Sequence, residues 1–159
     1  MKNRINRKLS LGAVLVSAVV FGSLAYSHCQ IPCGIYDDEA RLGAMAEHIT
    51  TIEKSMKEIE RLSAETKPNM NQIVRWVNNK EQHADELSEI VTYYFMAQRI
   101  KVPSESDAKA YNDYIKKLTL LHRMLVHAMK AKQTTDLANV QELRSLLEQF
   151  HGVYSGKAG

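Results

Sequence analysis

Residues 28–36 bring the chemically reactive side chains of this sequence together in one short run, His-Cys-Gln-Ile-Pro-Cys-Gly-Ile-Tyr. The run holds both cysteines of the chain and follows a segment typical of an export signal. If the chain is cut between Ser27 and His28, the new N-terminus offers a free amine, an imidazole, a backbone amide and the thiols of Cys29 and Cys33. Few functions other than tight binding of a transition metal use these groups together, so the run predicts a metal site.

The spacing of these groups favours a planar set of four ligands. The amine of His28 and the amide nitrogen of Cys29 can close one five-membered chelate ring, and the amide and thiolate of Cys29 can close a second. Cys33 can fold back through the turn at Pro32 as the fourth donor, while the His28 imidazole reaches an axial position. Two nitrogens and two sulfurs in a plane suit Ni(II), and a fifth, imidazole ligand favours Ni(III). We expect Tyr36 to cover the open face and to admit only small molecules.

The run also resembles a known family. The pattern H-C-x-x-P-C-G-x-Y, from His28 to Tyr36, is similar to the nickel hook at the mature N-terminus of nickel-containing superoxide dismutases. The resemblance implies one nickel ion per chain with His28, Cys29 and Cys33 as ligands, and catalysis by Tyr36, Cys29 and Cys33. It further implies that superoxide is converted to oxygen and hydrogen peroxide as nickel cycles between Ni(II) and Ni(III), in a homo-hexamer.

Beyond the hook, the resemblance continues in short stretches and has departures. Lys80-Glu81-Gln82 and Tyr94-Phe95 are similar to stretches of the family's second helix. Gln30 stands where the family commonly has Asp. Ala44 and His83 stand where many members carry a Glu and an Arg that steady the hook histidine. Such outer partners tune the orientation and affinity of a ligand, so the hook histidine needs other support here.

The segment 1–27 predicts a signal peptide. Four basic side chains precede an apolar run from Leu11 to Leu24, which is short for a membrane span and typical of a signal-peptide core. We therefore expect an exported protein, periplasmic or extracellular, without stable membrane association after cleavage. An uncleaved membrane anchor is the alternative.

The position of the cut decides whether the hook can form. Small residues at Ala25 and Ser27 fit cleavage before His28, whereas Ser23 and Ala25 fit cleavage that leaves Tyr26 as the first residue. Lipidation of the first cysteine is disfavoured, because a lipoprotein site requires a small residue where His28 stands.

Charge and length limit the possible functions. The chain carries 21 basic and 18 acidic residues, a net charge of +3. Four of the basic side chains lie in the predicted signal and none of the acidic ones do, so the segment 28–159 has a net charge of −1. This balance argues against a nucleic-acid partner. The segment 28–159 is long enough for one domain with a core that needs no disulfide.

After the hook, apolar residues recur every three or four positions, which predicts helices. Asp37 and Asp38 suit the N-terminal turn of the first helix. The predicted apolar face of the first helix contains Leu42, Met45, Ile49, Ile52, Met56 and Ile59, and that of the fourth contains Leu137, Val140, Leu143, Leu147 and Phe150. Breaks at Lys67-Pro68-Asn69, Pro103-Ser104 and Thr134-Thr135-Asp136 divide this part into four helices, the second from about Asn71 to Arg99. In the third helix, Ser104 to Asp107 resembles a capping box. The apolar face of that helix is predicted to contain Tyr111, Tyr114, Ile115, Leu118, Leu121, Leu125 and Met129.

These elements predict an all-α fold, an antiparallel four-helix bundle. The expected organisation is a signal peptide at 1–27, the nickel hook at 28–36, the bundle at 37–152 and a flexible tail at 153–159.

Bundles often hold di-iron sites built from two Glu-x-x-His pairs, but this sequence has one such pair, Glu148 with His151. His48, His122 and His127 show no ligand spacing and are expected at the surface or the core edge.

His83 is different, because it lies beside the apolar face of the second helix, next to Lys80 on that face. Polar groups there need partners, so we expect His83 to have one or to face the hook.

Two further functions use the same residues. A non-catalytic exported protein could carry copper or nickel on the hook, and copper binds most such ligand sets more tightly than nickel. A secreted structural bundle could instead pair Cys29 with Cys33 in a disulfide, which is common in exported proteins. The close spacing of the two cysteines gives such a bridge little effect on the fold, because a short loop constrains the unfolded chain weakly.

Overall fold

The computed structural model describes residues 37–104 and 106–156, all within one compact unit, and these residues are helical without any strand. The elements are α2 (Asp38–Ser63), α3 (Met70–Glu89), η1 (Ile90–Arg99), α4 (Ala108–Gln133) and α5 (Ala138–Tyr154). The prediction of an all-α fold is therefore confirmed. The predicted signal peptide and hook lie outside the described residues.

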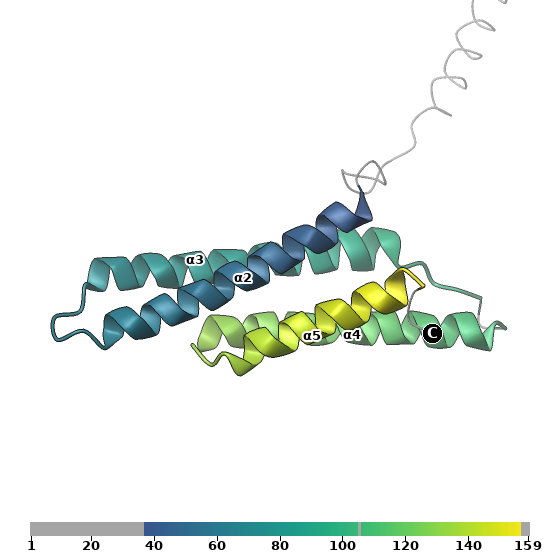
Figure 1. Ribbon diagram of the computed structural model, residues 1–159. Helices are drawn as coiled ribbons and strands as arrows, with labels where there is room; N and C mark the ends of the chain where they lie inside the picture. The colour runs from purple at the N-terminus through teal and green to yellow at the C-terminus, as the bar shows by residue number, and fades with distance from the viewer. Residues whose placement is uncertain (1–36, 105, 157–159) are drawn as a thin grey trace, which may run out of the picture. The chain divides into compact units, whose positions relative to one another are not determined.

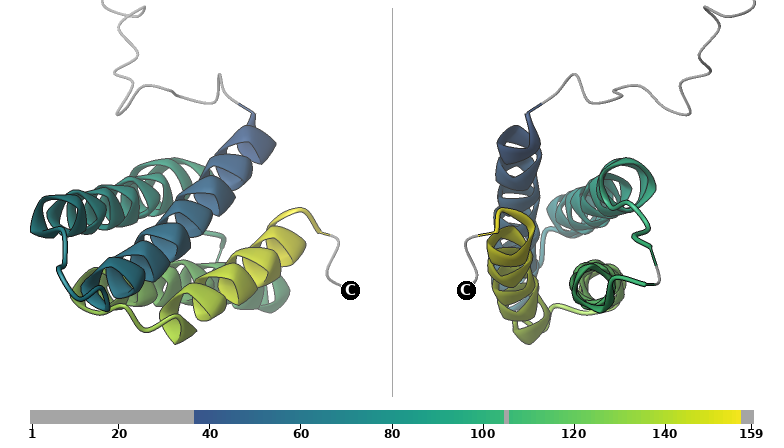
Figure 2. Two further views of the ribbon diagram at one scale, coloured as in Figure 1. Left: turned by 60° about the vertical axis from the view of Figure 1, so that its left-hand side comes forward. Right: turned by 90° about the vertical axis from the view of Figure 1, so that its right-hand side faces the viewer.

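Helix α3 continues directly into η1, and with these two counted as one, each helix of the bundle runs opposite to the one before it (Figure 1). Helix α2 packs against α3 and α5, and α4 packs against the same two helices, so the four surround a common core. Figure 2 shows this arrangement from two further sides. The largest fully buried side chains include Phe95, Phe150, Met45, Ile49, Ile52 and Met56. No helix in the described part of the chain has the length and apolar character needed to cross a membrane.

Helix α2 follows its sequence pattern closely. The side chain of Asp37 accepts a hydrogen bond from the Glu39 amide at 2.9 Å, which caps the helix, and Asp38 and Glu39 place negative charge at the positive end of the helix dipole. The predicted apolar face is buried along its whole length: Leu42, Met45, Ile49, Ile52, Met56 and Ile59.

The second predicted helix changes its winding. It begins at Met70 behind the capping Asn69, but from Ile90 to Arg99 it is a π-helix, in which amides bond to carbonyls five residues back. The amide of Ile100 donates to the carbonyl of Phe95 at 2.9 Å in this pattern. Ten residues is long for such a segment, and apolar periodicity gave no sign of it.

Helix α4 begins later than predicted. The side chain of Asp107 accepts a hydrogen bond from the Ala110 amide at 3.0 Å and is the N-cap. The prediction of a capping box with Ser104 as the N-cap was therefore wrong.

The predicted apolar face of α4 was also wrong in part. Leu121 is fully buried, but Tyr111, Ile115 and Met129 are 41%, 42% and 50% exposed. The buried face is rotated and contains Leu120, Leu121, Met124, Ala128 and Ala131.

Helix α5 has the predicted start and apolar face but ends later. Asp136 accepts a hydrogen bond from the Ala138 amide at 2.9 Å, and the buried side chains include Val140, Leu143, Leu147 and Phe150. The helix continues to Tyr154, two residues beyond the expected end of the bundle at 152. The reason is that Tyr154 packs its ring on Phe150, with ring centroids 5.3 Å apart.

Lys80 has the partners that a buried ammonium requires. Its side chain is 4% exposed, and Nζ donates to the carbonyls of Ala131 at 2.6 Å, of Lys132, and of Thr134 at 3.3 Å. These carbonyls at the C-terminal end of α4 lack partners within the helix, and a positive charge there also complements the helix dipole. Lys80 thus joins α3 to the end of α4.

Candidate metal centre

The predicted ligands His28, Cys29 and Cys33, together with Tyr36, lie outside the described residues. The structure does describe the segment that follows them directly. Asp37 is the first described residue and the N-cap of α2, so the hook is covalently continuous with the first turn of that helix.

The first turn of α2 is fixed by a cluster of polar side chains around Asp38. The Asp38 carboxylate accepts hydrogen bonds from the Tyr94 hydroxyl at 2.5 Å, the Tyr154 hydroxyl at 2.7 Å and Nη2 of Arg99 at 2.6 Å. Nε of Arg99 also donates to the Tyr154 hydroxyl at 3.3 Å. We call these four residues the Asp38 cluster. It ties the start of α2 to η1 and to the end of α5.

The π-helical winding explains how two residues of η1 reach one carboxylate. In an α-helix, residues five apart point about 140° away from each other, given 3.6 residues per turn. In a π-helix they lie on the same side, so Tyr94 and Arg99 both face Asp38.

Aromatic packing supports the Asp38 cluster from the core. The ring of Phe95 makes edge-on contacts with Phe150 at 5.0 Å and with Tyr154 at 5.4 Å between centroids. Such contacts limit the rotamers of Tyr154, which keeps its hydroxyl directed at Asp38.

The charges of the Asp38 cluster are set by these contacts. Burial raises the pKa of Asp38, but hydrogen bonds from Arg99, Tyr94 and Tyr154 lower it by more, so it lies below its ordinary value of 3.8. Burial and the hydrogen bond to Asp38 raise the pKa of Tyr94 to about 12. At neutral pH the cluster therefore contains a carboxylate, a guanidinium and two neutral phenols.

We expect Asp38→Asn to lower the free energy of unfolding by about 2 kcal/mol at pH 7, because charged hydrogen bonds become neutral ones. The pKa of Asp38 is lower in the folded than in the unfolded chain, so this stabilisation is present above about pH 4 and is lost as the pH falls through the folded value. The difference between variant and parent should accordingly shrink near pH 3. Urea denaturation at both pH values measures it.

Asp113→Asn is the matched control for this measurement, since Asp113 is an exposed carboxylate on α4. It should change the free energy of unfolding little at either pH. A deficit of Asp38→Asn that is the same at pH 7 and pH 3 would contradict the electrostatic explanation.

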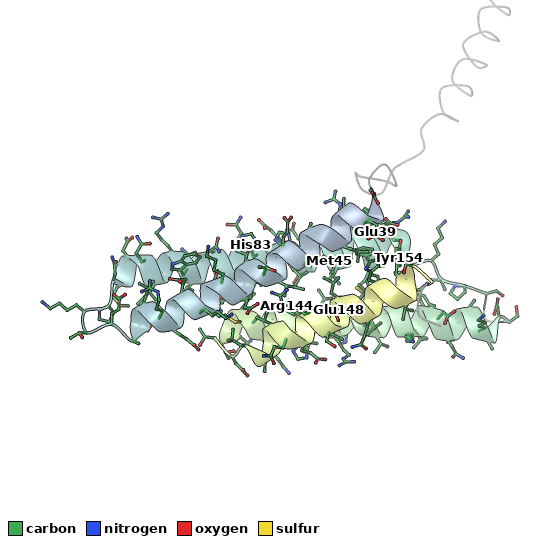
Figure 3. All side chains as sticks on the ribbon, viewed as in Figure 1. Glu39, Met45, His83, Arg144, Glu148 and Tyr154 are labelled. Atoms are coloured by element: carbon green, nitrogen blue, oxygen red, sulfur yellow. The ribbon has the colours of Figure 1, made fainter. Side chains whose placement is uncertain are left out.

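His83 has partners within the bundle. Its Nδ1 lies 2.8 Å from Nδ1 of His48 on α2 and 3.4 Å from Oε2 of Glu86, one turn further along α3. Figure 3 shows His83 near the middle of α3, whereas Glu39 and Tyr154 lie at the end where α2 begins. His48 is ten residues after Asp38, about 15 Å along α2 at 1.5 Å per residue.

The remaining histidines do not build a di-iron site in the described part of the chain. His122 is exposed, and Nδ1 of His127 lies 3.1 Å from Oδ1 of Asn139. Nε2 of His151 lies 2.9 Å from Oε1 of Glu39, while Glu148 is exposed.

Sequence reasoning missed the Asp38 cluster, and of the group around His48 it singled out only His83. Asp38 was expected only as a favourable residue for a helix N-terminus, Arg99 only as a helix end, and Tyr154 as part of the tail. His48 was expected to be an ordinary core-edge histidine. Their partners are 35 to 116 residues away in the sequence, so no local spacing could have indicated them.

Comparison with known proteins decides the family. A family model for nickel-containing superoxide dismutase matches residues 23–157. The chain belongs to the nickel-containing superoxide dismutase family. No match to this chain is found among curated proteins or among solved structures.

The extent of the match adds to what the hook alone indicated. It runs from before the hook to beyond the end of α5, so the bundle as well as the hook fits the nickel-containing superoxide dismutase family. The two stretches that resemble the family's second helix contain residues that stabilise the bundle. Lys80 donates hydrogen bonds to the end of α4, Tyr94 donates one to Asp38, and Phe95 is fully buried in the core.

Proposed function

We propose that the mature chain is an exported superoxide dismutase that begins at His28 and holds one nickel ion. The observation that carries this proposal is the family match over residues 23–157, which contains every residue of the hook. The reaction converts two superoxide anions and two protons into one oxygen molecule and one hydrogen peroxide molecule.

The donor groups of the hook fit nickel by their chemistry. His28 would bind through its terminal amine and imidazole, Cys29 through its amide nitrogen and thiolate, and Cys33 through its thiolate. Strongly donating thiolates and a deprotonated amide suit a nickel ion that alternates between two oxidation states. When bound, nickel supplies the one-electron couple that the disproportionation of superoxide needs.

The other groups act on substrate and structure. Tyr36 would position superoxide or peroxide through its hydroxyl, with ordered water. The Asp38 cluster holds the first turn of α2, to which the hook is joined, and thereby gives the hook a fixed attachment.

A homo-oligomer, a hexamer by the family pattern, forms part of this proposal. Its support is apolar surface that the protomer leaves exposed, including Tyr93, Val102, Tyr111 and Ile115 at 57%, 75%, 41% and 42%. Contact with further copies of the chain would bury such surface.

Intact mass and metal analysis of the natively isolated protein test the proposed function. We expect a chain beginning at His28, one nickel per chain, a Ni(III) signal and dismutase activity. Bound metal without turnover would show a metal-binding protein instead. A Cys29–Cys33 disulfide in freshly isolated protein would show a structural bundle.

We expect Tyr36→Phe to keep its nickel and to lose activity about 2- to 10-fold, the effect of one lost hydrogen bond of about 0.5–1.5 kcal/mol. Dismutase assays and metal analysis on the same preparation separate the two effects. Loss of the metal itself would make Tyr36 a ligand or a structural residue and would contradict its assignment.

A further inference from the structure

Three potential metal ligands meet between α2 and α3, apart from the residues of the hook. Nδ1 of His48 lies 2.8 Å from Nδ1 of His83 and 3.3 Å from Oε2 of Glu86, and Nδ1 of His83 lies 3.4 Å from the same oxygen. Two imidazole nitrogens approach so closely only when one donates a proton to the other or when both face a cation.

The three distances fit the coordination shell of a transition metal. Ions such as Zn²⁺ bind imidazole nitrogen and carboxylate oxygen at about 2.0–2.2 Å, which places neighbouring ligand atoms about 2.9–3.4 Å apart. The separations of 3.3 and 3.4 Å lie within this range, and the separation of 2.8 Å between the two imidazole nitrogens is about 0.1 Å below it. An ion therefore fits at bonding distance from all three atoms with little or no movement of the side chains.

A further hydrogen bond orients the carboxylate of this group. Oε1 of Glu86 accepts a hydrogen bond from Nε2 of Gln82 at 2.7 Å, which directs Oε2 toward the histidines.

The three side chains are partly exposed, so an ion in solution can reach them. The side chains of His48, His83 and Glu86 are 17%, 25% and 37% exposed. An ion can thus reach these atoms from solvent.

We propose that His48, His83 and Glu86 form a second metal site, which binds one divalent first-row transition ion across α2 and α3. Two imidazoles and one carboxylate suit Zn²⁺, Cu²⁺ or Ni²⁺, whereas Ca²⁺ and Mg²⁺ prefer oxygen ligands. The site goes beyond the proposed dismutase function, because none of its ligands belongs to the hook.

Titration of Zn²⁺ into the mature chain carrying Cys29→Ser and Cys33→Ser tests the site without the hook thiolates. We expect one Zn²⁺ per chain and a higher midpoint of thermal unfolding when Zn²⁺ is present, since the ion stabilises the folded state. His48→Ala or His83→Ala in this background should weaken Zn²⁺ binding about 100-fold or more, because losing even an outer partner of a ligand costs about 10- to 100-fold.

Two variants complete the experiment. His122→Ala removes an exposed histidine of α4 and should leave Zn²⁺ affinity unchanged. Glu86→Gln keeps the size of the side chain and should still weaken binding, which separates ligand loss from a packing effect. Circular dichroism checks that each variant is folded. Equal Zn²⁺ affinity in the parent and in the His48→Ala/His83→Ala double variant, or no binding by the folded parent, would overturn the proposal.

Discussion

Replacing Cys29 or Cys33 by serine is expected to abolish nickel binding and dismutase activity while leaving the helical content unchanged. A serine hydroxyl stays protonated at neutral pH and cannot replace a thiolate donor to nickel. The described bundle begins at Asp37, and its core comes from the four helices, so the fold does not depend on the hook thiols. Metal analysis, dismutase assays and far-ultraviolet circular dichroism on each variant measure the three quantities.

Gln30→Ser is the matched control, because it makes a change of similar kind within the hook at a residue without a predicted side-chain bond to the metal. It should keep nickel and most of its activity. Activity retained in either cysteine variant would remove the nickel mechanism. Loss of activity with unchanged nickel content would instead show that the altered thiol serves catalysis alone.

The helices that sequence predicted best are those whose apolar residues form one unambiguous face. In α2 the residues between Leu42 and Ile59 repeat at helical spacing with polar residues on the other sides, and all of the predicted face is buried. In α5 the turn at Asp136, which accepts a hydrogen bond from the Ala138 amide, and the face ending at Phe150 were equally clear.

Helix α4 shows where periodicity fails. Leu118, Leu125 and Met129 mark one apolar face, but Met124, Ala128 and Ala131 mark another beside it, and the smaller residues face the core. Alanines were overlooked because they add little to an apolar pattern, although they allow close helix packing.

The exposure of the start of α4 has a simpler cause. Helix α4 has 26 residues and α5 has 17, so in an antiparallel pair the first turns of α4 extend past the end of α5. Tyr111 and Ile115 lie in these turns. Their exposure depends on the length of a neighbouring helix, which the periodicity of α4 cannot reveal.

The candidate sites likewise differ in whether their residues are close together in the sequence or are brought together by the fold. The hook was recognisable as a candidate site because the potential ligands lie within nine consecutive residues of the sequence. The Asp38 cluster depends on a change from α- to π-winding at Ile90, and the pair of His48 and His83 depends on the register of α2 against α3. Both features arise from the packing of the helices against one another. The local residue types are equally compatible with other windings and other registers, so they do not predict these contacts.

Cleavage before His28 is expected to decide whether the protein has any nickel-dependent activity. The terminal amine exists as a ligand only when His28 is the first residue, because an upstream peptide bond converts it into an amide of very low basicity. One additional residue would also bring the chain end into the space where the hook folds around the metal. Protein that begins at Tyr26, or that keeps the whole signal segment, should therefore bind nickel poorly and show little or no dismutase activity.

Protein produced to begin at His28 should gain both properties when nickel is supplied under reducing conditions, which keep the two thiols free. The matched comparison is a chain beginning at Ser27, which has the same bundle and the same side chains in the hook but lacks the amine of His28. Circular dichroism should show equal helical content in both forms, since the first turn of α2 is fixed by the Asp38 cluster. N-terminal sequencing of the natural product makes the test direct: a mature start at Tyr26 with full nickel-dependent activity would refute the amine-ligand mechanism.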